Sequence, residues 1–153
     1  MYKFWSGKSI DSLKPNEVFV FGSNPEGRHG MGSAKAAYRF GAKYGQGRGL
    51  SGQTYALVTK NLKCGYIERS TGIQYLKIGN NSVTLNQIRE NIKGLFKVAD
   101  EFQNIDFLVT YQRGSKPLSG WLPEQIIELF LSIGMPRNIV LHDSFQWRSK
   151  HDT

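Results

Sequence analysis

The stretch Glu17–Ala37, EVFVFGSNPEGRHGMGSAKAA, decides the fold. It begins with an unbroken apolar run, Val18–Phe21, which is typical of a strand buried in the middle of a sheet. The chain then passes through a loop that holds Asn24 and four glycines, and it enters a predicted helix at Ser33. In α/β proteins such a strand, loop and helix start bind phosphate, because backbone N–H groups and the positive end of the helix dipole face the ligand. The stretch therefore predicts an anionic, nucleotide-like ligand.

The composition is that of a globular chain, and we expect one domain over residues 1–153. Hydrophobic residues make up 39% and aromatic residues 12%, enough to bury a core. No apolar run is long enough to span a bilayer, and the first residues lack the apolar segment of a signal peptide. A single cysteine, Cys64, excludes an internal disulfide framework and a cysteine-based metal site. These features predict a cytoplasmic protein.

The chain is basic, with a formal net charge of +8. Such a charge attracts nucleic acid, nucleotides or polyphosphate. The basic residues are spread along the sequence without a block of five or six, so a role in solubility with weak anion attraction is equally compatible. Charge alone does not separate a nucleotide site from a nucleic-acid surface.

The remaining patterns alternate between strands and helices. The expected strands are Tyr2–Trp5, Glu17–Phe21, Tyr55–Thr59, Asp106–Tyr111 and Asn138–His142. The expected helices are Ser33–Tyr44, a long helix after Thr84, and Pro123–Ile133. The long helix begins with a Thr84–Gln87 capping box and carries an apolar stripe at helical spacing, made of Leu85, Ile88, Ile92, Leu95, Phe96, Ala99 and Phe102. Asn61–Asn81 is assigned to loop with at most one short strand. This alternation predicts an α/β fold with a mainly parallel sheet and helices on both faces.

A second glycine-bearing loop, Gln112–Leu122, also follows a predicted strand and precedes a helix. Because ligands bind at the carboxyl ends of parallel strands, this loop and Gly22–Gly32 are expected at the same edge of the sheet. Two phosphate-binding loops at one edge suit a diphosphate better than a single loop does.

Three segments carry a resemblance to a known family. They are FGSNPEGRHGMGSA (Phe21–Ala34), FGAKYGQGRGLSGQTYALVTK (Phe40–Lys60) and FLVTYQRGSKPLSG (Phe107–Gly120). On these segments the chain resembles the macro-domain superfamily of ADP-ribose-binding proteins. It is most similar to a compact branch, found in bacteria and in T-even-type phages, whose members are assigned to ADP-ribose-1''-phosphate processing.

The resemblance implies a three-layer α/β/α sandwich with a mixed, mainly parallel sheet. It also implies a cleft whose two loops hold the diphosphate of ADP-ribose, with Asn24 near the distal ribose. The ligand-binding residues expected in the first loop are Gly22, Ser23, Arg28, Gly30, Met31, Gly32 and Ser33. Those expected in the second loop are Gly114, Ser115, Lys116 and Gly120.

The chain departs from the family pattern at three places. In the second loop it has Lys116-Pro117, where relatives usually have a small Cys-Gly-like pair. Macro domains usually carry an early Gly-Asp-Ile whose aspartate contacts adenine, whereas this chain has Gly7-Lys8-Ser9-Ile10, and Asp11 is the nearest carboxylate. Hydrolytic members often have an aspartate in the glycine loop, where this chain has Met31-Gly32-Ser33.

Each candidate residue has a functional and a structural interpretation. Asn24 and His29 are the candidate catalytic residues: the Asn24 amide would orient water or a ribose hydroxyl, and His29 would carry a proton. The alternatives are a side-chain bond that shapes the turn for Asn24 and an exposed loop histidine for His29. Ser33 is expected to cap its helix as well as to contact phosphate. Adenine-stacking candidates are Tyr111, Trp121 and Phe145, each with core or rim packing as the alternative.

Binding of ADP-ribose or a derivative in the two-loop cleft is the first functional expectation. The resemblance also implies hydrolysis by a metal-free enzyme without cofactors, acting on ADP-ribose-1''-phosphate or on ADP-ribosylated substrates. One alternative is a non-catalytic reader or sink of ADP-ribose, and another is a basic module that binds nucleic acid. No membrane partner is expected, and a phage-encoded chain would work in the host cytoplasm.

Overall fold

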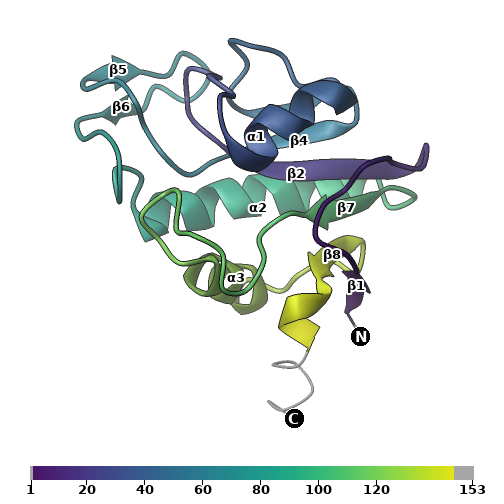
Figure 1. Cartoon of the computed structure of the whole chain (residues 1–153). Coiled ribbons are helices and arrows are strands. Elements are labelled where there is room, and N and C mark those ends of the chain that lie inside the picture. The colour runs from purple at the N-terminus through teal and green to yellow at the C-terminus, as the bar shows by residue number, and fades with distance from the viewer. Residues whose placement is uncertain (1, 147–153) are drawn as a thin grey trace.

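Six strands form a mixed sheet at the centre of the protein (Figure 1). In this computed structural model, which describes residues 2–146, the strand order is β1-β8-β7-β2-β4-β3. The strands are β1 Lys3–Trp5, β2 Glu17–Ser23, β3 Gly49–Ser51, β4 Thr54–Val58, β7 Asp106–Val109 and β8 Ile139–His142. All neighbours are parallel except β3 and β4, which are antiparallel. The mixed, mainly parallel sheet predicted from the sequence is therefore confirmed.

Helices cover both faces of the sheet and complete a three-layer α/β/α sandwich (Figure 1). The helices are α1 Gly32–Ala36, the 3-10 turn η1 Ala37–Phe40, α2 Leu85–Glu101, α3 Pro123–Ser132 and the 3-10 turn η2 Asp143–Phe145. Alternate residues of β2 divide the core: Val18 and Val20 pack with α2 and α3, whereas Phe19 and Phe21 pack with α1 and η1. This division explains why Val18–Phe21 has no polar position, since both faces of this part of β2 are buried.

The long helix α2 follows its sequence pattern. The Thr84 hydroxyl accepts a hydrogen bond from the Gln87 backbone at 3.1 Å, and the Gln87 side chain accepts one from the Thr84 backbone at 2.8 Å. The predicted capping box is therefore confirmed. The apolar stripe is buried at Ile88, Ile92, Leu95, Phe96 and Ala99, while Phe102 at the helix end is exposed.

The helix predicted over Ser33–Tyr44 is wrong in length and in its cap. The α-helical part ends at Ala36, and a 3-10 turn continues it to Phe40, where Gly41 ends the segment with a φ of 108°. Met31 is the N-cap residue and makes no side-chain capping bond, so Ser33 lies inside the first turn and does not cap it. A helix this short adds little dipole, and any phosphate contact here would depend on individual N–H groups.

Residues 61–81, predicted mainly as loop, contain a small hairpin of β5 Tyr66–Ile67 and β6 Gln74–Tyr75. A buried ion pair fixes it to the body of the protein: Arg48 donates to both oxygens of Glu68, at 2.8 and 2.9 Å. Burial alone would raise the pKa of Glu68, but hydrogen bonds from Arg48, Tyr75 and Thr71 and the Arg48 charge lower it overall. A hairpin held by long-range polar contacts has little local sequence pattern.

The structure describes only part of the chain to which two predictions apply: one domain over residues 1–153, and no segment that spans a membrane. The ends of the predicted domain, Met1 and residues 147–153, lie outside the described residues. Within residues 2–146, no helix combines the length and the apolar character needed to cross a membrane.

Candidate functional site

A cleft of about 720 Å³ lies at the carboxyl ends of three adjacent strands. Gly22 and Ser23 end β2, Thr59 and Lys60 follow β4, and Thr110 follows β7. The chain leaves β2 through α1 toward β4 on one side and returns through α2 to β7 on the other side. Parallel sheets bind ligands at such a reversal of strand order, and the volume falls in the range of small-molecule sites, about 300–1,000 Å³.

The side chains around the cleft are cationic, hydroxyl-bearing or apolar. The cations are Lys8, Arg28, Arg39, Lys60 and Lys116. The aliphatic hydroxyls are Ser9, Ser23, Ser33, Thr59, Thr110, Ser115 and Ser119. Among the described residues that line the cleft there is no Asp or Glu, although Arg28 lies 3.7 Å from Glu26, which is outside the lining. Nor do residues 2–146 contain a group of three or more His, Cys, Asp or Glu that could hold a metal ion.

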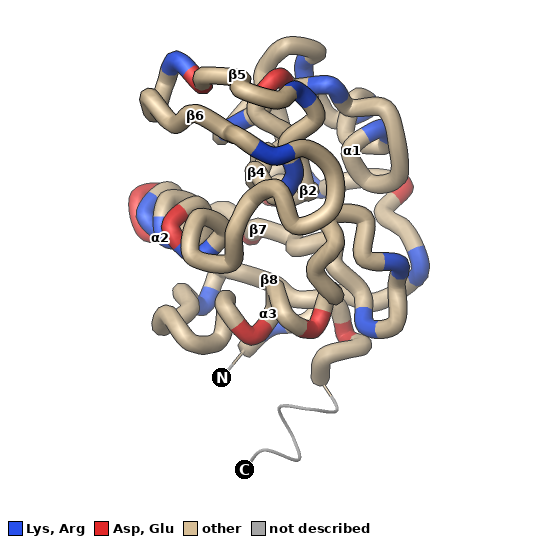
Figure 2. Tube along the Cα trace, turned by 90° about the vertical axis from the view of Figure 1, so that its left-hand side faces the viewer, with Lys and Arg blue, Asp and Glu red and all other residues tan. Residues whose placement is uncertain are grey.

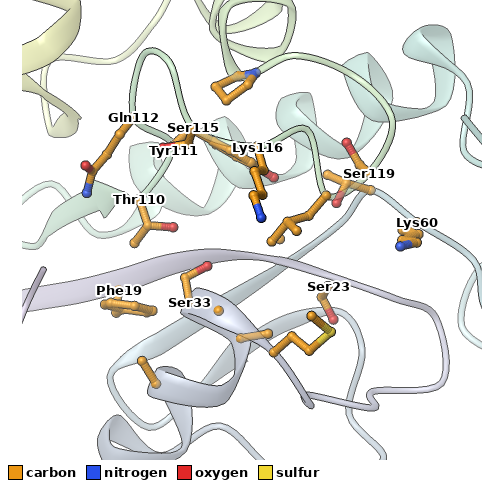
Figure 3. A pocket seen from close by; sticks show the side chains of 18 of the residues that line it. Phe19, Ser23, Ser33, Lys60, Thr110, Tyr111, Gln112, Ser115, Lys116 and Ser119 are labelled. Atoms are coloured by element: carbon orange, nitrogen blue, oxygen red, sulfur yellow. The ribbon is translucent and has the colours of Figure 1, made fainter. Parts of the chain in front are cut away.

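The two predicted loops face each other across this cleft. Figure 3 shows Lys116 reaching from the 112–122 loop toward the side where Ser23 and Ser33 lie. Most predicted residues of the first loop line the cleft: Gly22, Ser23, Asn24, Arg28, Gly30, Met31, Gly32 and Ser33. Lysine, serine hydroxyls and loop N–H groups on opposite walls are the donors that a bridging diphosphate needs.

Asn24 shapes the first loop with its side chain. Its amide nitrogen donates to the Arg28 carbonyl at 2.8 Å, and its amide oxygen accepts from the Arg28 N–H at 3.0 Å. The residue is buried and both ends of the amide are used within the loop. The turn-shaping interpretation of Asn24 therefore describes what this side chain does, although the residue also lines the cleft.

His29 does not reach the cleft, so its predicted placement beside the ligand site is wrong and its predicted role as a proton carrier has no support from the structure. Its ring is only 2% exposed, and it packs edge-on against Phe21 at 5.0 Å between ring centroids. Nε2 lies 3.1 Å from the carbonyl oxygens of both Lys43 and Gln46. Because carbonyls only accept hydrogen bonds, Nε2 carries the proton, and the ring joins the first glycine loop to residues 43–46. The alternative of an exposed loop histidine is equally wrong, since the ring is buried.

A second glycine segment supports the first loop from behind. A Cβ added to Gly27 would overlap the Gln46 backbone, and one added to Gly47 would overlap the carbonyl oxygen of Asn24. Two backbone segments can approach this closely only where side chains are absent. Gly27 and Gly47 thus let residues 45–47 pack directly behind the cleft loop, and neither glycine lines the cleft.

Only two of the four residues predicted in the second loop line the cleft. Ser115 and Lys116 line the cleft, but Gly114 and Gly120 do not. The Gly114 N–H donates to the Glu124 carboxylate at 3.0 Å and is already used. Gly120 has a φ of 88°, and a Cβ there would meet the Asn81 nitrogen at 2.6 Å, so this glycine is needed for packing. Neither glycine therefore lies at the cleft, where the predicted phosphate contacts would be made.

Tyr111 forms part of the cleft floor, but its hydroxyl is buried and makes no hydrogen bond of standard geometry. A Cβ on Gly22 would stand 2.9 Å from this hydroxyl, so Gly22 makes room for it. Burial raises the pKa of Tyr111 to about 12, and the adjacent Thr59 hydroxyl partly offsets this rise. Gly22 is thus a packing position as well as a lining one.

The other aromatic candidates differ in their placement. Trp121 lines the cleft and donates its indole N–H to the Val83 carbonyl at 2.8 Å. Phe145 is buried in the core and lies under the Arg113 guanidinium, so it is no stacking partner. Trp5, which the sequence did not single out, also lines the cleft.

Other lining residues were missed at the sequence level. Thr59 and Lys60 directly follow β4, and the rule that ligands bind at strand carboxyl ends could have identified them. Lys8 and Ile10 lie in an N-terminal loop with no motif, brought to the cleft partly by a 2.8 Å bond from Gln112 to the Lys8 carbonyl. No local signal points to that contact.

Comparison with known proteins identifies no relative. No protein-family model matches the chain, no curated protein matches it, and no solved structure matches it. Function is therefore inferred from the motif residues and from the cleft itself.

Proposed function

We propose that this protein is a macro-domain-like module that binds ADP-ribose or one of its derivatives in the cleft at the ends of β2, β4 and β7. The observation that carries the proposal is the composition of the lining: its described residues include five cations and no carboxylate. Such a lining favours a ligand with several negative charges. The cleft volume and its apolar side chains suit a ligand that also has a base and sugars.

The diphosphate is assigned to the space between the two loops. Ser23, Ser33 and the N–H groups near Gly32 would contact it from one wall, and Ser115 and Lys116 from the other. Trp5 and Trp121 are the aromatic lining residues available to a base. Asn24 and the residues behind it hold the first loop in the shape that these contacts need.

Binding has better support than hydrolysis. The lining residues described in the structure include no Asp, Glu, His or Cys that could act as a general base or nucleophile. Turnover of ADP-ribose-1''-phosphate would have to use a phosphate of the substrate itself to activate water. We therefore rank a reader or sink of ADP-ribose first and a metal-free hydrolase second.

A thermal-shift series tests the binding proposal. ADP-ribose, ADP and ribose 5-phosphate are each added at increasing concentration, and the midpoint of unfolding is recorded. A ligand that binds only the folded state raises this midpoint by mass action. We expect ADP-ribose to raise it at lower concentration than either fragment, and no shift with ADP-ribose would contradict the proposal.

Product analysis separates reader from enzyme. The protein is incubated with ADP-ribose-1''-phosphate and, separately, with a mono-ADP-ribosylated protein, and released phosphate or ADP-ribose is measured. We expect binding without product. Product from either substrate would move hydrolysis to first place.

A further inference from the structure

We propose that the outer surface of the α1 layer binds single-stranded nucleic acid, a function separate from the one proposed for the cleft. The surface consists of three cations and two tyrosines, here called the basic–aromatic patch: Lys35, Tyr38, Arg39, Lys43 and Tyr44. All five are exposed, Tyr38 by 39% and Tyr44 by 71%. Because both tyrosines are exposed, an unpaired base can reach them and stack on them.

Helical spacing and two contacts of His29 bring the members of the patch together. Lys35, Tyr38 and Arg39 follow one another at helical spacing on α1 and η1, so they share a face. The Tyr38 ring lies 5.4 Å from the ring of the buried His29. His29 also bonds to the Lys43 carbonyl, so one buried ring joins the helical part of the patch to Lys43 and Tyr44.

The charge of this region is not balanced along the chain. Between Glu26 and Glu68 there is no Asp or Glu, while the same segment holds seven Lys and Arg: Arg28, Lys35, Arg39, Arg48, Lys43, Lys60 and Lys63. Arg48 is neutralised by Glu68, as described above. In Figure 2, Lys and Arg lie around α1, whereas both signs mix along α2.

Two carboxylates border the patch and limit its charge. Glu26 lies 3.7 Å from Arg28, and its side chain is only 14% exposed. Asp11 follows Ile10, whose carbonyl accepts a bond from Arg39 at 3.3 Å. Neither makes a salt bridge to Lys35 or Lys43 among the described contacts, so these two lysines remain available to an anion.

The mixture of groups favours a single strand over other polyanions. Lysines and arginine would contact phosphates, and the tyrosine faces would stack with unpaired bases, which every base allows. A duplex hides its base faces, and an acidic peptide has no base to stack. The patch also continues into the cleft, because Arg39 belongs to both.

Fluorescence anisotropy with a labelled oligothymidine of about 15 nucleotides tests the proposal. The variants are Lys35→Ala/Lys43→Ala and Tyr44→Ala, whose residues do not line the cleft. The matched control is Lys93→Ala/Lys97→Ala, which removes two exposed lysines from α2 on the opposite face of the sheet. Circular dichroism checks that each variant folds.

We expect the patch variants to bind the oligonucleotide about tenfold more weakly, and the α2 variant to change by less than about twofold. The dependence of log K on log salt should become shallower by about 1.4 in the double patch variant, since two phosphate contacts are lost. ADP-ribose affinity should stay unchanged in every variant. If the protein does not bind ADP-ribose at all, the cleft proposal fails and the patch proposal is unaffected.

Two outcomes would overturn the patch proposal. Equal losses in the α2 and patch variants would mean that only net charge matters. Competition by polyglutamate as effective as that by unlabelled oligothymidine, with no effect of Tyr44→Ala, would mean that the surface is a generic anion site.

Discussion

The Cα of Gly47 lies so close to the carbonyl group of Asn24 that no side chain fits at position 47. The same is true of Gly27 against the Gln46 backbone. Two glycine segments, distant in sequence from each other, therefore pack backbone against backbone behind the cleft. The shape of the first glycine loop therefore depends on residues that do not line the cleft.

Gly47→Ala should destabilise the protein strongly. The new methyl would overlap a main-chain oxygen, so the two segments must separate, at a cost of about 3 kcal/mol or more in the free energy of unfolding. Gly30→Ala is the matched control, because nothing lies within 4 Å of a Cβ there. Urea denaturation of both variants measures the difference, and equal stabilities would contradict the packing described here.

Gly32→Asp should abolish ADP-ribose binding. Gly32 has a φ of 59° and lines the cleft, so the substitution adds a carboxylate where the phosphates are proposed to lie. Gly45→Asp adds the same charge at another positive φ, 91°, with open space around the Cβ and outside the cleft lining. Equilibrium titration should show lost affinity for Gly32→Asp only. Retained affinity in a folded Gly32→Asp protein would exclude this loop as the phosphate site.

Lys116→Ala should weaken ADP-ribose binding by about fivefold, or about 1 kcal/mol, the value of one charge-assisted hydrogen bond. Lys116 extends across the cleft from the second loop. Lys97→Ala, on the far side of the sheet, removes the same charge and serves as control. If both variants bind ADP-ribose with the same affinity, Lys116 contributes only to the overall electrostatic field of the protein.

Tyr111 should give stability a distinct dependence on alkaline pH. A tyrosine in an unfolded chain titrates near pH 10, and burial raises the pKa of Tyr111 in the folded chain to about 12. The folded state holds this proton more tightly than the unfolded state does. The contribution of the protonated Tyr111 to the free energy of unfolding is therefore complete below about pH 10 and is lost between about pH 10 and 12. The free energy of unfolding should fall less steeply over this window in Tyr111→Phe. Parallel pH profiles would show that the phenol is not buried as described.

The sequence predicted those elements of the fold whose pattern lies within a single segment of the chain. The capping box at Thr84 and the apolar stripe of α2 were predicted because each lies within a few turns of one helix. The α1 segment was not, because Gly41 and contacts with Gly52 and Gln53, in the turn between β3 and β4, end it earlier than its own pattern suggests. The 61–81 hairpin escaped prediction because it depends on the Arg48–Glu68 pair, 20 residues apart.

The residues of the candidate site divide in the same way, into those marked by a local sequence pattern and those placed by tertiary contacts. The ends of β2 and β7 were predicted to border the cleft, because the glycine loops there are visible in the sequence. His29 was assigned to the wrong environment, since a histidine between Arg28 and Gly30 gives no sign that Phe21 and the 43–46 carbonyls enclose it. Lys8 reaches the cleft only through the tertiary fold, beyond any local pattern.

The measurement that tests the central claim most directly is a calorimetric titration with ADP-ribose at low and at physiological salt. Close contacts from loop N–H groups, hydroxyls and Lys116 are screened less than contacts with exposed surface charge, whose field decays over about 8 Å at physiological salt. We predict saturable binding at one site that weakens only modestly between the two conditions. Absence of binding, or a loss as steep as that of oligothymidine measured in parallel, would contradict an ADP-ribose site in this cleft.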